Sequence, residues 1–283
     1  MRGMTAAPEP RGLYLNSMGK ASGSALAVVG VALASAILLA CGGGPAATYI
    51  PHDATLRALP LSFYPSSQRA RPASAFVFFF GNDVGFWKPH RELAAALASD
   101  GYSVVGIDIR PVLASLPDRE PARDSAFAAR IMSIIVASRH ELSADSVPLI
   151  LAGHSLGAEI AIWTAAHVDI GRVTGVLAMS PRSRSHLRAT LNDIANRGEP
   201  TDAESFDVGD AVRALPAPVR LAIVRGEHDK YATADSALIS AGGARADRYV
   251  VPLAGHSLRN ILIAGYVVSR ALGWILQPLA ARR

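Results

Sequence analysis

A serine, an aspartate and a histidine lie in three separate segments of this chain, each after a run of apolar residues. Ser155 lies in GHSLG, Asp229 in RGEHD and His256 in AGHS. A serine hydroxyl is a weak nucleophile that becomes reactive when a histidine takes its proton and a carboxylate orients that histidine. These residues therefore predict acyl transfer, with Ser155 as nucleophile, His256 as base and Asp229 as orienting acid.

The GHSLG segment is typical of a nucleophile elbow, the sharp turn between a strand and a helix that exposes a serine. The apolar run LILA precedes it, and Gly153 and Gly157 supply the small residues that such a turn needs. A negative oxygen that develops on the substrate needs backbone N–H donors nearby. We expect these donors to be the N–H of Leu156 and, from the loop GNDVGFW, that of Asn82, with Asp83 as the next candidate.

Other residues near the proposed acid and base compete for these roles. Glu227 and Asp235 are alternative acids, and His228 is an alternative base. We favour Asp229 because Glu227 follows a glycine too closely to reach outward. We favour His256 because His228 lies within the acid loop itself.

Strands and helices alternate along the chain in the predicted secondary structure. We predict strands over 75–80, 102–107, 147–152, 173–179, 218–225 and 247–252, helices over 89–100, 119–140, 156–167, 233–241 and 257–273, and one or two leading strands within 54–64. Continuous apolar strands separated by helices predict an α/β fold, with a mostly parallel sheet covered on both faces. The carboxyl ends of such strands share one edge, where ligands bind.

Composition narrows the classes of function. The chain has 283 residues, of which 50% are hydrophobic and 18% charged, as in a globular protein. The net charge of +5 is spread along the chain rather than gathered in a block, so we expect no nucleic-acid partner. No metal-ligand spacing is present in the sequence, and we expect neither a metal nor another cofactor.

The amino-terminal segment predicts export. Residues 25–40 carry no charge, Lys20 precedes them, and Leu38-Leu39-Ala40-Cys41 resembles the lipobox of bacterial lipoproteins. We therefore predict a lipoprotein-type signal peptide over 1–40, a tether over 41–53 and one domain over 54–283. Cys41 would carry the lipid and hold the protein at a membrane of the periplasm. An ordinary signal peptide and a single membrane anchor are the alternatives, and either Met1 or Met18 is the start.

Three further residues are candidates for substrate binding at the same edge. Trp87 follows the loop of the second oxyanion donor, and Arg182 and Arg184 follow the strand 173–179. Guanidinium groups match anionic headgroups in geometry and charge. The alternatives are core packing for Trp87 and a solvated surface for the arginines.

Taken over residues 54–275, the motifs GHSLG, GEHD and GHS resemble those of serine hydrolases with the α/β-hydrolase fold. The stretch FFFGNDVGFWKPHRELAAALASDGYSVVGIDIR is similar to the bacterial VirJ/AcvB-type virulence proteins. That resemblance implies an exported protein acting on lipids such as aminoacylated phosphatidylglycerol. It also allows an alternative, a non-catalytic periplasmic component of a secretion or virulence system.

Overall fold

The computed structural model describes residues 49–68, 71–119, 121–171, 173–195, 197–259 and 261–277, without the side chains of 261 and 262. The predicted signal peptide and Cys41 lie outside these residues. Residues 49–53 of the predicted tether are among the described residues, and Tyr49 and His52 make hydrogen bonds to α5 (Ala122–Glu141). The side chain of Glu141 accepts hydrogen bonds from the Tyr49 hydroxyl and the His52 N–H, at 2.7 Å each. Residues 49 and 52 of the predicted tether therefore contact α5 of the domain, and the predicted boundary at residue 54 stays a prediction.

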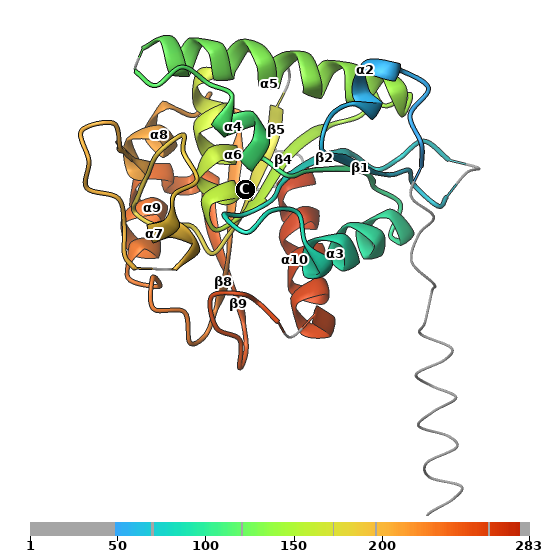
Figure 1. Ribbon diagram of the computed structural model, residues 1–283. Helices are drawn as coiled ribbons and strands as arrows, with labels where there is room; N and C mark the ends of the chain where they lie inside the picture. The colour runs from blue at the N-terminus through green and yellow to red at the C-terminus, as the bar shows by residue number, and fades with distance from the viewer. Residues whose placement is uncertain are drawn as a thin grey trace, which may run out of the picture. The chain divides into compact units, whose positions relative to one another are not determined.

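The predicted α/β fold is confirmed. The strands form one sheet of seven in the order β1-β3-β2-β4-β5-β8-β9 (Figure 1). Strand β1 pairs antiparallel with β3, and the other neighbours are parallel. The strands of this sheet are β1 (Leu61–Tyr64), β2 (Phe76–Phe80), β3 (Ser103–Ile107), β4 (Leu149–His154), β5 (Val173–Met179), β8 (Arg220–Gly226) and β9 (Ala246–Val251).

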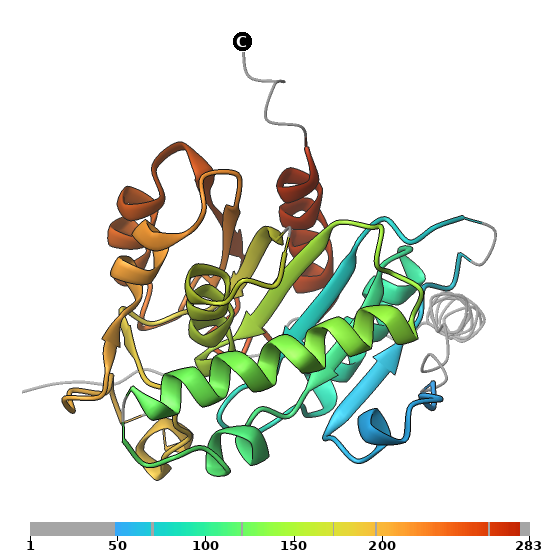
Figure 2. The same ribbon diagram turned by 90° about the horizontal axis from the view of Figure 1, so that it is seen from above.

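Helices cover both faces of the sheet. Helices α3 (Lys88–Ser99) and α10 (Ile261–Leu276) pack on one face, with apolar side chains of the sheet between them and the strands. The other face carries α5 (Ala122–Glu141), α6 (Leu156–His167), α8 (Val208–Ala214) and α9 (Ala234–Gly242). Figure 2 shows α5 and α6 on the near side of the sheet and α10 on the far side.

This two-sided burial explains the apolar runs of the strands. In β2, Phe76, Phe78 and Phe80 belong to the core under α5 and α6, whereas Val77 and Phe79 belong to the core under α3 and α10. Side chains of a strand alternate between faces, so a strand buried on both sides is apolar at every position.

Short elements complete the domain at the carboxyl-end edge of the sheet or beside the sheet. They are α2 (Ala54–Arg57), α4 (Arg110–Ala114), α7 (Leu191–Ile194), the 3₁₀ turn Gly243–Arg245, and the two-stranded sheet of β6 (Arg184–Ser185) and β7 (Phe206–Asp207). The sequence predicted one or two leading strands within 54–64, and the structure has the helix α2 there followed by one strand, β1. Within the described residues, no helix is both long and apolar enough to cross a membrane.

Candidate active site

Ser155 lies on a strained turn between β4 and α6. Its backbone has φ 53° and ψ −124°, a combination that costs energy for a residue with a side chain. The turn is tight: a Cβ on Gly153 would lie 2.0 Å from the carbonyl oxygen of Gly157. A Cβ on Gly157 would lie 2.4 Å from the carbonyl oxygen of Gly81. Glycine is therefore required at 153 and 157, as the elbow predicted.

The structure brings together the three residues that were predicted from the sequence to form the catalytic site. The Ser155 Oγ lies 2.9 Å from Nε2 of His256. The Nδ1 of His256 lies 3.1 Å from both carboxylate oxygens of Asp229. A carboxylate only accepts, so Nδ1–H donates to Asp229 and Nε2 is left to accept from the serine hydroxyl. This is the protonation state that a serine nucleophile needs.

The acid is buried and held anionic. Asp229 is 5% exposed. Burial alone would raise the pKa of its carboxyl, but hydrogen bonds from His256 and Arg225 outweigh burial and hold that pKa well below its usual range. The backbone N–H of Tyr231 also donates to it, at 3.1 Å. The alternative acid Asp235 instead accepts from Arg225 Nε, at 3.0 Å.

The sequence interpretation missed Arg225, which is 1% exposed at the end of β8. It donates to Asp229 at 2.7 Å, to Asp235 at 2.6 Å and to the Pro181 carbonyl at 2.5 Å. The sequence pattern that indicates this role is an arginine within the apolar strand LAIVRG, four residues before an acid.

The second oxyanion candidate lies in a turn against the elbow. The Asn82 carbonyl accepts from the Gly85 N–H at 2.9 Å, and its Oδ1 accepts from the Val84 N–H at 3.2 Å. The contact between Gly157 and Gly81 brings this turn against the first turn of α6, where Leu156 is the first helical residue. The N–H groups of a helix's first turn have no partner within the helix and are available to an anion.

Asp83 lies in the same turn and is 8% exposed. Burial is the main cause that raises the pKa of its carboxyl, while the charges of Arg182 and His256 act to lower it.

The predicted role of Arg182 needs correction. Arg182 is 3% exposed, and its guanidinium donates to both carboxylate oxygens of Glu159 at 2.9 Å and to Asp193 at 2.9 Å. Four of its five N–H donors have protein acceptors, counting the Gly198 carbonyl at 3.3 Å. Arg182 thus supports the loop after β5, and its geometry argues against a headgroup clamp.

Arg184 and Trp87 are also engaged within the domain. Arg184 donates to Ser205 Oγ at 2.6 Å and to the Pro200 carbonyl at 3.3 Å, which joins the two ends of the segment around α7. Trp87 precedes α3, and its ring meets that of His90 edge-on at 6.0 Å. Its position beside the oxyanion turn agrees with the prediction, but no contact identifies it as a substrate residue.

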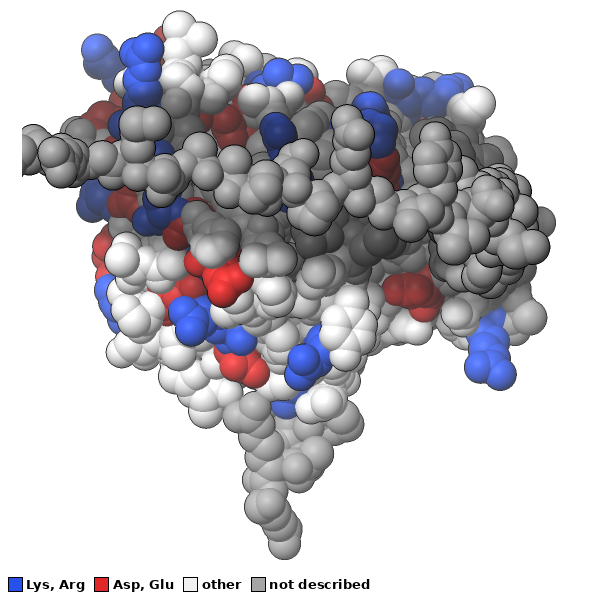
Figure 3. Space-filling model, turned by 90° about the horizontal axis from the view of Figure 1, so that it is seen from below, with Lys and Arg blue, Asp and Glu red and all other residues white. Residues whose placement is uncertain are grey.

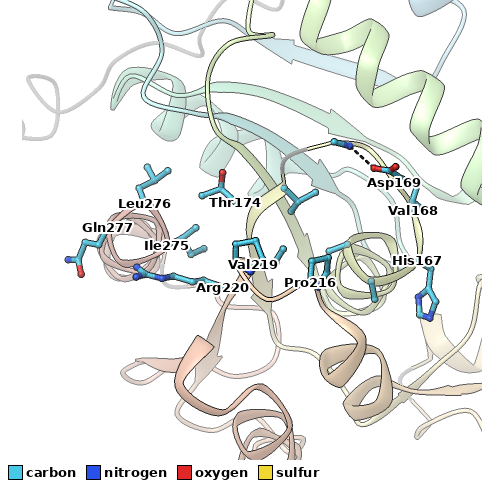
Figure 4. A pocket seen from close by; sticks show the side chains of 15 residues that line it. His167, Val168, Asp169, Thr174, Pro216, Val219, Arg220, Ile275, Leu276 and Gln277 are labelled. Atoms are coloured by element: carbon cyan, nitrogen blue, oxygen red, sulfur yellow. Dashed lines mark hydrogen bonds between the residues drawn. The ribbon is translucent and has the colours of Figure 1, made fainter. Parts of the chain in front are cut away.

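A cavity of about 810 Å³ lies away from these residues (Figure 4). Thr174 and Arg220, which line it, belong to the starts of β5 and β8, and Ile275 to the end of α10. The amino ends of parallel strands lie opposite the edge that carries Ser155 and His256. We therefore place the chemistry at the triad and not in this larger cavity.

On the face in Figure 3, basic and acidic side chains are interspersed among uncharged ones. Across the part of the chain that the structure describes, no three His, Cys, Asp or Glu side chains gather in a way that could hold a metal.

Comparison with known proteins settles the fold. No family model matches the chain, and no curated protein matches its sequence. A Klebsiella pneumoniae structure named for dienelactone hydrolase is similar at TM-score 0.56 and 19% identity, over 78% of this chain and 93% of that one. The chain has the α/β-hydrolase fold.

Two further structures share this α/β-hydrolase fold. The esterase domain of a Rhodothermus marinus protein matches at TM-score 0.53 and 17% identity, over 77% of this chain and 92% of that one. Est1E from Butyrivibrio proteoclasticus matches at TM-score 0.54 and 16% identity, over 77% and 94%. At these identities the similarity establishes the fold alone. The resemblance to VirJ/AcvB-type proteins is not among these findings and stays a prediction.

Proposed function

We propose that this chain is a serine hydrolase that cleaves a carboxylic ester through an acyl-enzyme. The observation that carries the proposal is the hydrogen-bonded series from Ser155 Oγ to His256 and on to Asp229, at 2.9 Å and 3.1 Å. It lies on a strained elbow, at the sheet edge where α/β folds bind ligands. These three side chains are far apart in the sequence and meet at this edge. With the proton of His256 on Nδ1, its Nε2 is free to take the proton of the serine hydroxyl, as nucleophilic catalysis needs.

The proposed reaction has two halves. Ser155 Oγ attacks the ester carbonyl as its proton moves to Nε2 of His256, and the carbonyl oxygen becomes an oxyanion facing the N–H groups of Leu156 and Asn82. Collapse expels the alcohol, which takes the proton from His256. Water then attacks the acyl-enzyme while His256 takes its proton, and the bond between the acyl carbon and Ser155 Oγ breaks as His256 returns that proton to Oγ, which releases the acid and regenerates the serine. The loss of one oxyanion donor typically raises such a barrier by about 3 kcal/mol.

The test is covalent labelling with a fluorophosphonate together with hydrolysis of p-nitrophenyl butyrate. We expect wild type to label and to hydrolyse the ester, and Ser155→Ala to lose labelling and to lose at least about 10⁴-fold in kcat. Ser133→Ala, on the exposed side of α5, is the matched control and keeps both activities. Wild type that neither labels nor hydrolyses any ester would refute the proposal and favour a non-catalytic binding component.

We also propose a substrate class. One structure of the similar Est1E protein has ferulic acid bound, at 15% identity and TM-score 0.54 over 81% of this chain and 100% of that one. An acid of that kind is the acyl part of a small carboxylic ester. The resemblance to VirJ/AcvB-type proteins favours acyl or aminoacyl esters of phospholipids. Hydrolysis of a bacterial lipid extract by wild type and by Ser155→Ala, read by mass spectrometry, separates the two classes.

We further propose that the protein is exported and lipid-anchored at Cys41. The support is the sequence alone, an uncharged run ending in Leu38-Leu39-Ala40-Cys41. Metabolic labelling with a fatty acid should mark the full chain, and Cys41→Ser should abolish the label. A labelled Cys41→Ser chain would contradict the anchor.

A further inference from the structure

Two buried histidines connect three segments around the triad. His90 of α3 lies 3.2 Å, through Nδ1, from the carbonyl oxygen of Gly85 in the oxyanion turn. Its Nε2 lies 3.1 Å from Nδ1 of His154, the residue before Ser155. The Nε2 of His154 lies 2.9 Å from the main-chain carbonyl oxygen of His256. Both histidines are 4% exposed.

The number of protons limits how these contacts can be made. Carbonyl oxygens only accept, so each of the three contacts needs one proton on an imidazole nitrogen, and two neutral imidazoles carry two. The shortest contact ends on the His256 carbonyl, which places a proton on Nε2 of His154. The one proton of neutral His90 then serves only one of its two contacts, with His154 at 3.1 Å or with the Gly85 carbonyl at 3.2 Å.

Burial keeps the pair neutral at ordinary pH. It lowers the pKa of His90 to about 2 and that of His154 to about 4, and the charge on His256 adds to the effect on His154. Asp229 and Glu159 act in the opposite direction on His154. An additional acidic side chain, Glu92 of α3, lines the mainly apolar cavity of about 50 Å³ that adjoins both imidazoles.

We propose that His154, supported by His90, is a positioning residue that fixes the main chain of His256 against Ser155. This inference rests on the proposed hydrolase function. Apolar side chains would fill the same space without the cost of burying polar imidazoles. What the imidazoles add is a hydrogen bond to the carbonyl of the proposed base.

The backbone conformation of the segment that carries His256 explains why this hydrogen bond matters. It connects β9 to α10 and contains two residues with positive φ, Leu253 at 57° and Leu258 at 48°. The turn has its own hydrogen bond, from the Leu258 N–H to the Gly255 carbonyl at 3.1 Å. His154 adds a contact from the rigid end of β4. Misplacement of a reacting group by about 1 Å can cost about 10²-fold in rate.

Two substitutions of His154 distinguish a role in positioning the His256 main chain from simple packing. In His154→Gln, the amide nitrogen reaches the place of Nε2 and keeps the donor to the His256 carbonyl. In His154→Asn, the shorter amide reaches only the place of Nδ1, beside His90. We expect His154→Asn to lose at least about tenfold in kcat for p-nitrophenyl butyrate with a smaller change in KM, and His154→Gln to stay within about threefold of wild type.

Both variants are measured on the full chain, with active sites counted by fluorophosphonate labelling. Equal kcat per labelled site in wild type and in both variants would overturn the inference, even where thermal stability falls. A wild type that does not label would instead refute the hydrolase function. In that case the proton NMR signal of the N–H between His256 and Asp229 gives the answer, since it needs no substrate.

We expect that NMR signal in His154→Gln at the wild-type position, and shifted or broadened in His154→Asn. An unchanged signal in both would contradict the inference. Should His154→Asn not fold, His90→Leu removes the support one step farther away. It should then lower kcat by more than the roughly threefold change allowed for His154→Gln, and a kcat within about threefold of wild type in His90→Leu would also overturn the inference.

Discussion

Arg225 donates to the same carboxylate that receives the imidazole of the proposed base. Its Nη1 lies 2.7 Å from one oxygen of Asp229, and its other donors contact Asp235 and the Pro181 carbonyl. The buried cation thus lies between two buried anions at the end of β8. It both keeps Asp229 ionised and fixes its orientation toward His256.

Replacement of Arg225 by methionine should destabilise the fold and reduce catalysis. The substitution leaves two buried carboxylates without their cation, and breaking a buried pair on one side typically costs about 3–5 kcal/mol. We expect the free energy of unfolding in urea to fall by about that amount. Residual folded enzyme should show a lower kcat, because Asp229 loses a partner that orients it.

Arg248→Met is the matched control. That side chain is 51% exposed and lies 3.8 Å from Asp235, a distance and exposure at which ion pairs contribute about 1 kcal/mol or less. Equal losses in the free energy of unfolding in Arg225→Met and Arg248→Met would contradict the conclusion that the buried position of Arg225 matters.

The order of strands and helices along the chain could be predicted because its physical signal is local. The strand expected over 173–179 is β5 to the residue, and the helix over 156–167 is α6. Parallel strands buried on both faces have continuous apolar runs, and glycines mark the turns after them. Ser155, Asp229 and His256 follow such runs, so their meeting at one edge follows from the topology.

The buried polar contacts could not be predicted in the same way. The polar segment SPRSRSHLR predicted either headgroup binding or a solvated surface for Arg182, yet its partner Glu159 comes from α6, 23 residues away. The partners of His154, which are His90 and the His256 carbonyl, also come from distant segments. Nothing in one segment reveals a partner in another. The short helices α4 and α7 also lack the repeated apolar pattern that identifies longer ones.

The buried histidine pair should make stability depend on pH. In the unfolded chain histidines take up protons below about pH 6.5, whereas in the fold His154 stays neutral to about 4 and His90 to about 2. The unfolded state therefore binds more protons as pH falls from 6.5 toward 4, and stability falls. Each histidine contributes a slope of up to about 1.4 kcal/mol per pH unit, and above 6.5 this loss is absent.

Urea unfolding between pH 4.5 and 7.5 measures that slope. His154→Gln should reduce it by up to one proton, and Ser133→Ala, which changes no titrating group, should leave it as in wild type. The lowered pKa of Asp229 adds a loss that begins near pH 5 as pH falls, and this loss is common to wild type and both variants. A His154→Gln slope identical to that of wild type would show that the imidazole is not held neutral.

The glycines of the elbow should tolerate no side chain. In Gly157→Ala the new Cβ would lie 2.4 Å from the carbonyl oxygens of Gly81 and Phe80, so the backbone must move. We expect a loss of at least about 2 kcal/mol in the free energy of unfolding and a large fall in kcat, because the same contact places the oxyanion turn. Gly273→Ala, exposed in α10 with no atom within 4 Å of its Cβ, should gain up to about 1 kcal/mol. The prediction fails if the two substitutions have effects of the same sign.

Substitution of Arg182 decides between a structural and a substrate-binding role. Glu159 is fully buried, and in Arg182→Met its carboxylate would lose the bidentate partner. We expect the free energy of unfolding to fall by about 3 kcal/mol or more. KM should then change equally for neutral p-nitrophenyl butyrate and for an anionic ester such as p-nitrophenyl hemisuccinate, because the guanidinium does not face substrate.

If instead stability were unchanged and KM rose tenfold for the anionic ester alone, the guanidinium would be the headgroup clamp that the sequence suggested. Arg184→Met, whose contacts stay within the segment around α7, should change stability by only about 1 kcal/mol and thereby calibrate the comparison.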